Sequence, residues 1–182
     1  MPELPLVKVG PYPAERQQVF EFFLFSCFFC QDHHDTIASW GASIPPPVKF
    51  ESVPVIVDFD SFVAARAFYA VKKVAPEKLG QYMRAALDGA RRGISNAAAP
   101  EILKIAGVPQ KAFDQAWRSP TIKDPLTRAV ELTGRYKLAA TPSIAIGGRT
   151  VLHADLVGGD YGVMIRLASG FVSRVLEGRD AI

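Results

Sequence analysis

The chain has 182 residues, of which 49% are hydrophobic and 21% are charged, and its formal net charge is +3. A chain of this size can bury one substantial core, or one domain that carries a sizeable insertion. The small net charge, without a dense cluster of lysines and arginines, argues against a nucleic-acid-binding protein. The longest apolar stretch, 20–29, is interrupted by Glu21 and is about half of the roughly 20 residues that a membrane-spanning helix needs.

The amino-terminal sequence MPELPLVKVGPYP contains one lysine, four prolines and no continuous apolar stretch. It therefore does not have the pattern of a signal peptide. We expect either a cytosolic protein or the mature form of an exported one. Two cysteines are too few for a scaffold of several disulfides, so their number leaves the compartment open.

The first third of the chain alternates between strand and helix patterns. Residues 18–25 are aromatic and apolar, which predicts a strand buried on both faces. A helix is expected over 30–40, with Gly41 as its stop signal, and a second strand over 48–57. Pro54 has no N–H to donate, so this second strand is expected at a sheet edge. Strand, helix and strand in this order predict a right-handed βαβ unit.

The middle of the chain, from residue 58 to residue 138, contains helical patterns and no convincing strand. Prolines stand near the starts of these segments, where a missing N–H costs little. We therefore expect an all-helical insertion. The predicted helical segments are 61–74, 76–93, 99–107, 109–117 and 124–136.

A sequence pattern typical of strands returns at 141–152, where Gly147-Gly148 fits the tight turn of a β-hairpin. The chain then ends in a predicted helix over 160–176. Four apolar residues spaced four apart are expected to form its buried stripe. They are Val163, Leu167, Phe171 and Val175.

The only two cysteines, Cys27 and Cys30, lie where the first strand gives way to the first helix. A sulfur at a helix amino terminus meets unpaired backbone N–H groups and the positive end of the helix dipole, which favour the thiolate. The thiolate is the species that attacks a disulfide, and a second cysteine one turn further on can close the ring and release the attached group. This spacing predicts a redox pair, although zinc sites use it too.

Two further features fit thiol chemistry. Glu21 is a lone acid in an apolar strand, on the face that points towards the region beneath Cys27. We interpret it as a buried proton acceptor whose protonated form is favoured by desolvation; the alternative is a carboxylate that reaches water at the sheet edge. Thr141-Pro142 opens the returning strand. It is either a simple strand opener or a cis peptide that presents the backbone of Thr141 to an extended substrate.

His33 and His34 provide the main grounds for a metal site. Together with the two cysteines they supply four candidate zinc or copper ligands within eight residues. On one helix, however, these side chains fan around more than half of the circumference, and tetrahedral convergence would need the helix to unwind. We therefore expect no metal and two solvent-exposed histidines. A weaker hypothesis is that His34 tunes the thiol of Cys30.

The segments EFFLFSCFFC, TPSIAIGGRTVL and AGVPQKAFDQAW, with its flanking helices, resemble the DsbA family of thiol:disulfide oxidoreductases in the same order along the chain. The resemblance implies an α/β protein with a thioredoxin-like fold and an all-helical domain inserted after the βαβ unit. It places the thioredoxin-like domain at 1–58 and 139–182, and the inserted domain at 59–138.

Carried over by position, the resemblance also implies roles for individual residues. Cys27 is similar to the exposed nucleophile and Cys30 to the buried resolving thiol. Glu21 is similar to the buried acid below the active site, and Thr141-Pro142 to the cis-proline loop that pairs with substrate. No metal and no cofactor are implied.

The dipeptide between the cysteines departs from the family pattern, in which it is proline and histidine and the histidine helps to hold the thiolate. Here it is Phe28-Phe29. Neither residue can donate a hydrogen bond to the sulfur, and two large rings would partly desolvate it. We therefore expect Cys27 to be less acidic, and the disulfide less oxidising, than in a typical family oxidase. Exposed Phe28 and Phe29 would also form an apolar rim that binds unfolded chains.

The resemblance implies a monomer that introduces disulfides into reduced or misfolded protein substrates in the periplasm, after a signal peptide has been removed. Re-oxidation implies a quinone-linked membrane oxidase as partner, and the altered dipeptide puts that partnership in question. A disulfide reductase or isomerase with a less oxidising site stays open as an alternative. So do a Cys/His metal-binding module and a protein that binds unfolded chains without turnover.

Overall fold

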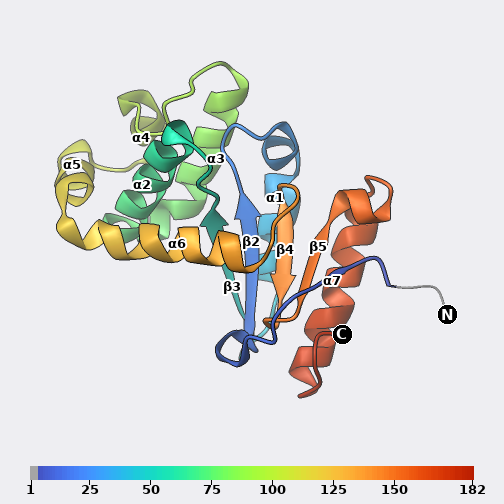
Figure 1. The fold of residues 1–182 in the computed structure, drawn as a ribbon. Coiled ribbons are helices and arrows are strands. Elements are labelled where there is room, and N and C mark those ends of the chain that lie inside the picture. The colour runs from blue at the N-terminus through green and yellow to red at the C-terminus, as the bar shows by residue number, and fades with distance from the viewer. Residues whose placement is uncertain (1–3) are drawn as a thin grey trace. The chain divides into compact units, whose positions relative to one another are not determined.

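The computed structural model describes residues 4–182, which form a five-stranded sheet and seven α-helices (Figure 1). By their internal contacts these residues divide into two units. The first contains the chain up to Phe23, together with His33–Val53 and Thr133–Ile182. The second contains Leu24–Asp32 and Pro54–Leu132. The domain boundaries expected from the sequence, at 58/59 and 138/139, stay a prediction.

The sheet belongs to the first unit and has the order β1-β5-β4-β2-β3. Antiparallel pairing joins β1 to β5, β5 to β4 and β4 to β2. β3 lies at the sheet edge, as Pro54 predicts, and Figure 1 shows its arrow pointing the same way as that of β2. The strands are β1 (Val7–Lys8), β2 (Gln18–Phe23), β3 (Lys49–Pro54), β4 (Ser143–Ile146) and β5 (Thr150–His153).

The interior strand β2 is covered on both faces, as its mostly apolar sequence predicts. On one face, Val19 packs in a cluster that includes Ile37 of α1 (Phe28–Ala42) and Phe171 of α7 (Tyr161–Leu176). On the other face, the rings of Phe20 and Phe22 pack against Tyr136, with ring centroids 5.8 and 5.5 Å apart. The core of this unit therefore packs on both faces of β2.

The carboxyl-terminal elements follow the sequence pattern with one correction. Gly147 and Gly148 form the turn of the β4–β5 hairpin with φ angles of 63° and 66°. In α7, however, Val163 and Leu167 are only half-buried. A helix turns by about 100° per residue, so a strict four-residue spacing drifts by about 40° per step and leaves the buried face. The buried positions are Met164, Ala168, Phe171, Val172 and Val175.

The second unit is helical, and each helix predicted in the middle of the chain is present. Asp58 caps α2 by accepting a hydrogen bond from the backbone N–H of Ser61 at 2.8 Å. Pro100 occupies the first turn of α4, and short 3₁₀ turns that open with Pro76 and Pro120 precede α3 and α6. The helices are α2 (Phe59–Val74), α3 (Leu79–Arg91), α4 (Pro100–Ala106), α5 (Gln110–Arg118) and α6 (Lys123–Arg135).

Substitutions at Gly148 and Gly158 distinguish the cost of backbone strain from the cost of a steric clash. Both have a positive φ, but a Cβ at Gly148 would lie 2.4 Å from the carbonyl oxygen of Tyr12, whereas a Cβ at Gly158 meets nothing within 4 Å. Gly158→Ala should lower the free energy of unfolding by about 1–2 kcal/mol, the cost of a left-handed alanine. Gly148→Ala should cost at least about twice as much. Urea unfolding followed by circular dichroism measures both, and equal losses would contradict the steric argument.

Candidate active site

Helix α1 begins directly after Cys27. The backbone N–H of Gln31 donates to the carbonyl of Cys27 at 3.0 Å and closes the first turn. The backbone N–H of Cys30 lies 3.4 Å from the sulfur of Cys27. This sulfur therefore holds the place that a serine or aspartate oxygen takes at an ordinary helix N-cap. Because a charged acceptor makes the stronger hydrogen bond, the helix start favours the thiolate of Cys27.

The two cysteines differ in exposure. Both are in the reduced thiol form; Cys27 is partly exposed, whereas Cys30 is buried, with 2% of its surface accessible. A thiol from another molecule can therefore approach Cys27 more readily than Cys30. This difference agrees with the roles that the sequence resemblance implies, an accessible nucleophile and a buried resolving thiol.

Phe28 and Phe29 both point into solvent, with 61% and 54% of their surface exposed. Their rings pack edge to face, with centroids 5.8 Å apart. They form the apolar rim that the sequence predicts next to Cys27. Since more than half of each side chain is in water, desolvation of the sulfur is a weaker effect than we expected. The missing hydrogen-bond donor becomes the main reason to expect a less acidic thiol.

The loop before the helix is held by contacts within the second unit. The side-chain amide of Gln31 donates to the carbonyl of Phe25 at 2.9 Å, across the loop that carries Cys27. The ring of Phe25 packs edge-on against Tyr82, with centroids 6.1 Å apart. The sequence analysis missed these residues, because a glutamine after Cys30 has the appearance of an ordinary exposed helix residue.

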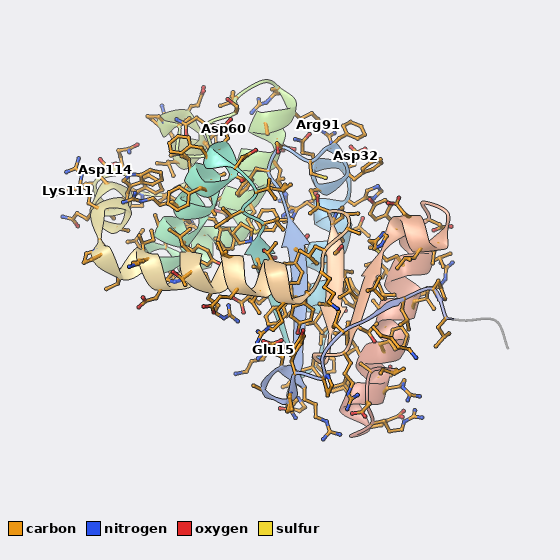
Figure 2. All side chains as sticks on the ribbon, viewed as in Figure 1. Glu15, Asp32, Asp60, Arg91, Lys111 and Asp114 are labelled. Atoms are coloured by element: carbon orange, nitrogen blue, oxygen red, sulfur yellow. The ribbon has the colours of Figure 1, made fainter. Side chains whose placement is uncertain are left out.

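An ion pair joins the same segment to α3. Asp32, in the first turns of α1, pairs with Arg91 at the end of α3, and Figure 2 labels both side chains. Both are partly exposed, so the pair adds little to the free energy of unfolding.

Glu21 lies in the middle of β2 with 1% of its surface exposed. The hydroxyl of Ser52 on β3 donates to its carboxyl at 2.7 Å. Burial raises the pKa of Glu21 to about 7, against a smaller lowering by the Ser52 hydrogen bond. The alternative of a carboxylate that reaches water is therefore wrong. Near neutral pH this carboxyl can both hold and release a proton.

Thr141-Pro142 is a cis peptide, as one of the two sequence interpretations expects. Ser143, the next residue, begins β4 and pairs with Phe22, while Glu21 pairs with Ile144. Pro142 therefore precedes Ile144, the partner of Glu21 on the adjacent strand, by two residues. Pro142 and Glu21 lie near the carboxyl end of β2, from which the chain runs on to Cys27.

The histidines do not behave as expected for an exposed helix face. His34 is buried, with 7% of its surface exposed, and the ring of His33 stacks on Tyr161 with centroids 3.5 Å apart. The reason is helical periodicity, because His34 precedes the fully buried Ile37 by three residues and shares its face. Within residues 4–182, no three or more His, Cys, Asp or Glu side chains are grouped to hold a metal ion.

A pH-dependent stability follows from the buried carboxyl. The folded pKa of Glu21, about 7, exceeds the model value of 4.5, so the folded state keeps a proton that the unfolded state loses. Stability should fall by about 3 kcal/mol between pH 4.5 and pH 7 and level off above. Glu21→Gln should remove this fall, as measured by urea unfolding of the reduced protein at both pH values. Parallel pH profiles for the two proteins would contradict the assignment.

No model of a known protein family matches this chain. The thiol:disulfide interchange protein DsbA of Bordetella parapertussis is 22% identical over 166 residues, which cover 89% of this chain and 79% of the relative. The DsbA of Burkholderia cepacia is 25% identical over 139 residues, 75% of this chain and 66% of the relative. The crystal structure of Pseudomonas aeruginosa DsbA matches with a TM-score of 0.84 and 21% identity, over 96% of this chain and 93% of that one.

The fold is thus the one expected from the sequence, a thioredoxin fold with a helical insertion. Within the described chain, no helix is both long and apolar enough to cross a membrane. By sequence and by fold this chain is similar to DsbA proteins, and its pair Cys27 and Cys30 is separated by two phenylalanines.

Proposed function

We propose that this chain is a thiol:disulfide oxidoreductase that donates a disulfide between Cys27 and Cys30 to other proteins. The observation that carries the proposal is the sulfur of Cys27 at the N-cap of α1, within reach of the backbone N–H of Cys30. Such a start to the helix stabilises the thiolate, and a stable thiolate is a good leaving group. The similarity to DsbA proteins supports the same activity.

The reaction begins with the oxidised pair. A substrate thiolate attacks the sulfur of Cys27, the disulfide bond to Cys30 breaks, and Cys30 takes up a proton. The second substrate thiolate then attacks the substrate sulfur of this mixed disulfide, and Cys27 leaves as a thiolate. The substrate loses two electrons and gains a disulfide, while the enzyme pair is reduced.

Glu21 supplies the proton relay in this proposal. Its pKa of about 7 lets it give a proton to the leaving thiolate of Cys30 and take one back when the pair is re-oxidised. An acid with an ordinary pKa would be ionised at neutral pH and would have no proton to give to the thiolate of Cys30. Its burial beside Ser52 keeps it out of direct exchange with solvent.

Substrate binding is assigned to two features. Phe28 and Phe29 offer exposed rings to apolar side chains of an unfolded chain. Thr141, before the cis-proline, offers backbone groups to an extended segment. Both features recognise chain flexibility and apolar character more than a particular sequence.

The proposed setting is the periplasm, with the protein acting as a monomer on reduced or misfolded proteins. A quinone-linked membrane oxidase is the proposed source of oxidising equivalents. The rim formed by Phe28 and Phe29 directly follows the nucleophile in the chain and is exposed, so such a partner would have to accept two aromatic rings at its contact surface.

A disulfide reductase or isomerase is the alternative that the sequence left open, and the similarity to DsbA proteins does not favour it. One feature of the site still makes it worth testing. Neither Phe28 nor Phe29 can donate a hydrogen bond to the sulfur of Cys27, which makes the reduced pair less stable and the disulfide less oxidising. Equilibration in glutathione buffers decides between the candidates. A potential well above the glutathione poise supports the donor, and one well below it supports the reductase.

Single cysteine variants test the order of the two steps. Cys27→Ser should reduce oxidation of a dithiol peptide to the uncatalysed rate, because no accessible nucleophilic sulfur remains. Cys30→Ser should instead accumulate a mixed disulfide between Cys27 and a peptide supplied as its activated disulfide. Mass spectrometry detects this adduct. Adduct formation through Cys30 in the Cys27→Ser variant would contradict the assignment.

The dipeptide variant Phe29→His tests the cause of the expected low acidity. A histidine at this position can donate to the sulfur, and we expect it to lower the pKa of the Cys27 thiol by about one unit. The potential should rise by about 30 mV. Thiolate absorbance against pH and glutathione equilibration measure the two quantities. Phe29→Leu is the matched control, since it removes the ring without adding a donor, and an equal shift in this control would contradict the explanation.

A further inference from the structure

The second unit contains a groove that the thiol chemistry does not use. It lies between α2, the end of α5 and the first turns of α6, and its volume is about 550 Å³. Sites for small molecules have volumes of roughly 300–1,000 Å³. Its walls are mostly apolar, and Phe62 and Val130 leave 37% and 52% of their surface in solvent. The apolar lining consists of Ile56, Phe62, Pro120, Ile122, Leu126 and Val130.

Three cations also line this groove, and no acidic residue is among its lining residues. They are Arg66, Arg118 and Lys123. In the part of the chain that the structure describes, no carboxylate lies within ion-pair distance of any of them. Arg66 instead donates from Nε to the carbonyl of Trp117 at 3.0 Å and lies over its ring. These partners are neutral, so the positive charge stays uncompensated.

Two neighbouring features add to the positive potential. The ammonium of Lys73 donates to the hydroxyl of Ser119, which lines the groove, at 2.8 Å. The amino-terminal end of α6 opens at Lys123 and contributes the positive end of a helix dipole. Asp124 in the same turn is exposed and is not a lining residue, so it offsets this potential only from outside the groove.

We propose that this groove binds a small amphipathic anion of the fatty-acid type. Its apolar chain lies along Phe62, Leu126 and Val130, and its carboxylate faces Arg118 and Lys123. An extended peptide fits less well, because its backbone N–H and C=O groups would lose their water against apolar walls. The only neutral polar side chains in the lining are those of Ser119 and Thr127. A hydrocarbon chain has no such groups to satisfy.

The test uses dodecanoate as the probe, titrated calorimetrically into the whole protein below the concentration at which it forms micelles. Dodecyltrimethylammonium, with the same chain and the opposite charge, should bind at least about tenfold more weakly, a difference of about 1.4 kcal/mol. The double variant Arg118→Glu, Lys123→Glu should weaken dodecanoate binding by at least about tenfold. Val130→Ser should weaken it too, because it removes apolar wall.

Lys111→Glu is the matched control for the single variant Lys123→Glu, which should also weaken dodecanoate binding, since both make the same change of charge. Lys111 of α5 is exposed, is outside the lining and is labelled in Figure 2. Lys111→Glu should leave dodecanoate binding within about twofold. If Lys111→Glu and Lys123→Glu weaken dodecanoate binding equally, the effect comes from the overall charge of the protein, and the proposal is overturned. So would equal binding of the two detergents, or tighter binding of an acidic, apolar peptide, which would make this a protein-docking surface.

Circular dichroism of each variant checks that the helices are intact. If Arg118→Glu, Lys123→Glu fails to fold, Val130→Ser and the comparison of the two detergents still decide the question. The proposal does not depend on the redox function, because dodecanoate contains no sulfur and the lining residues, which lie within 56–66 and 118–130, do not include the cysteines. Turnover of a dithiol peptide by the wild-type protein reports on the redox function separately.

Discussion

The chemistry of this protein depends on one contact, that between the backbone N–H of Cys30 and the sulfur of Cys27. It exists because the loop after β2 leads directly into α1, so that the first cysteine caps the helix and the second lies within its first turn. The sulfur thereby receives a donor that no side chain needs to supply. Gln31, bonded to the carbonyl of Phe25, closes the loop around the same sulfur. The helix start is therefore a preformed thiolate site.

The sheet supplies the second constraint. Because β2 is covered on both faces, a carboxyl in its middle cannot reach water, and the cost of burying its charge raises the pKa of Glu21 to about 7. The register with β4 places Pro142 two residues before Ile144, which is the partner of this acid. A strand that had one face in solvent would have carried an ordinary glutamate, so the raised pKa follows from the burial of the strand and not from the residue type alone.

Much of this could be predicted from residue patterns. The apolar run of β2, the prolines before the helices and the glycine pair of the hairpin each have a local cause, and local causes can be read from sequence. The burial of His34 could not, because it depends on which face of α1 packs on the sheet. Gln31 and Ser52 were missed for the same reason: their partners, Phe25 and Glu21, are fixed by the fold and not by spacing.

A thiolate at this site can be stabilised by two kinds of hydrogen-bond donor, one from the backbone and one from a side chain of the dipeptide. The N-cap donor comes from the backbone and is present whatever the intervening residues are, whereas a histidine donor is absent here. The site thus keeps one of two stabilising contributions and replaces the other with two exposed rings. In the proposed function, Phe28 and Phe29 bind substrates by apolar contact, which is tolerant of sequence. In the proposed function, the same dipeptide that we expect to make the disulfide less oxidising therefore also broadens the range of chains that the protein binds.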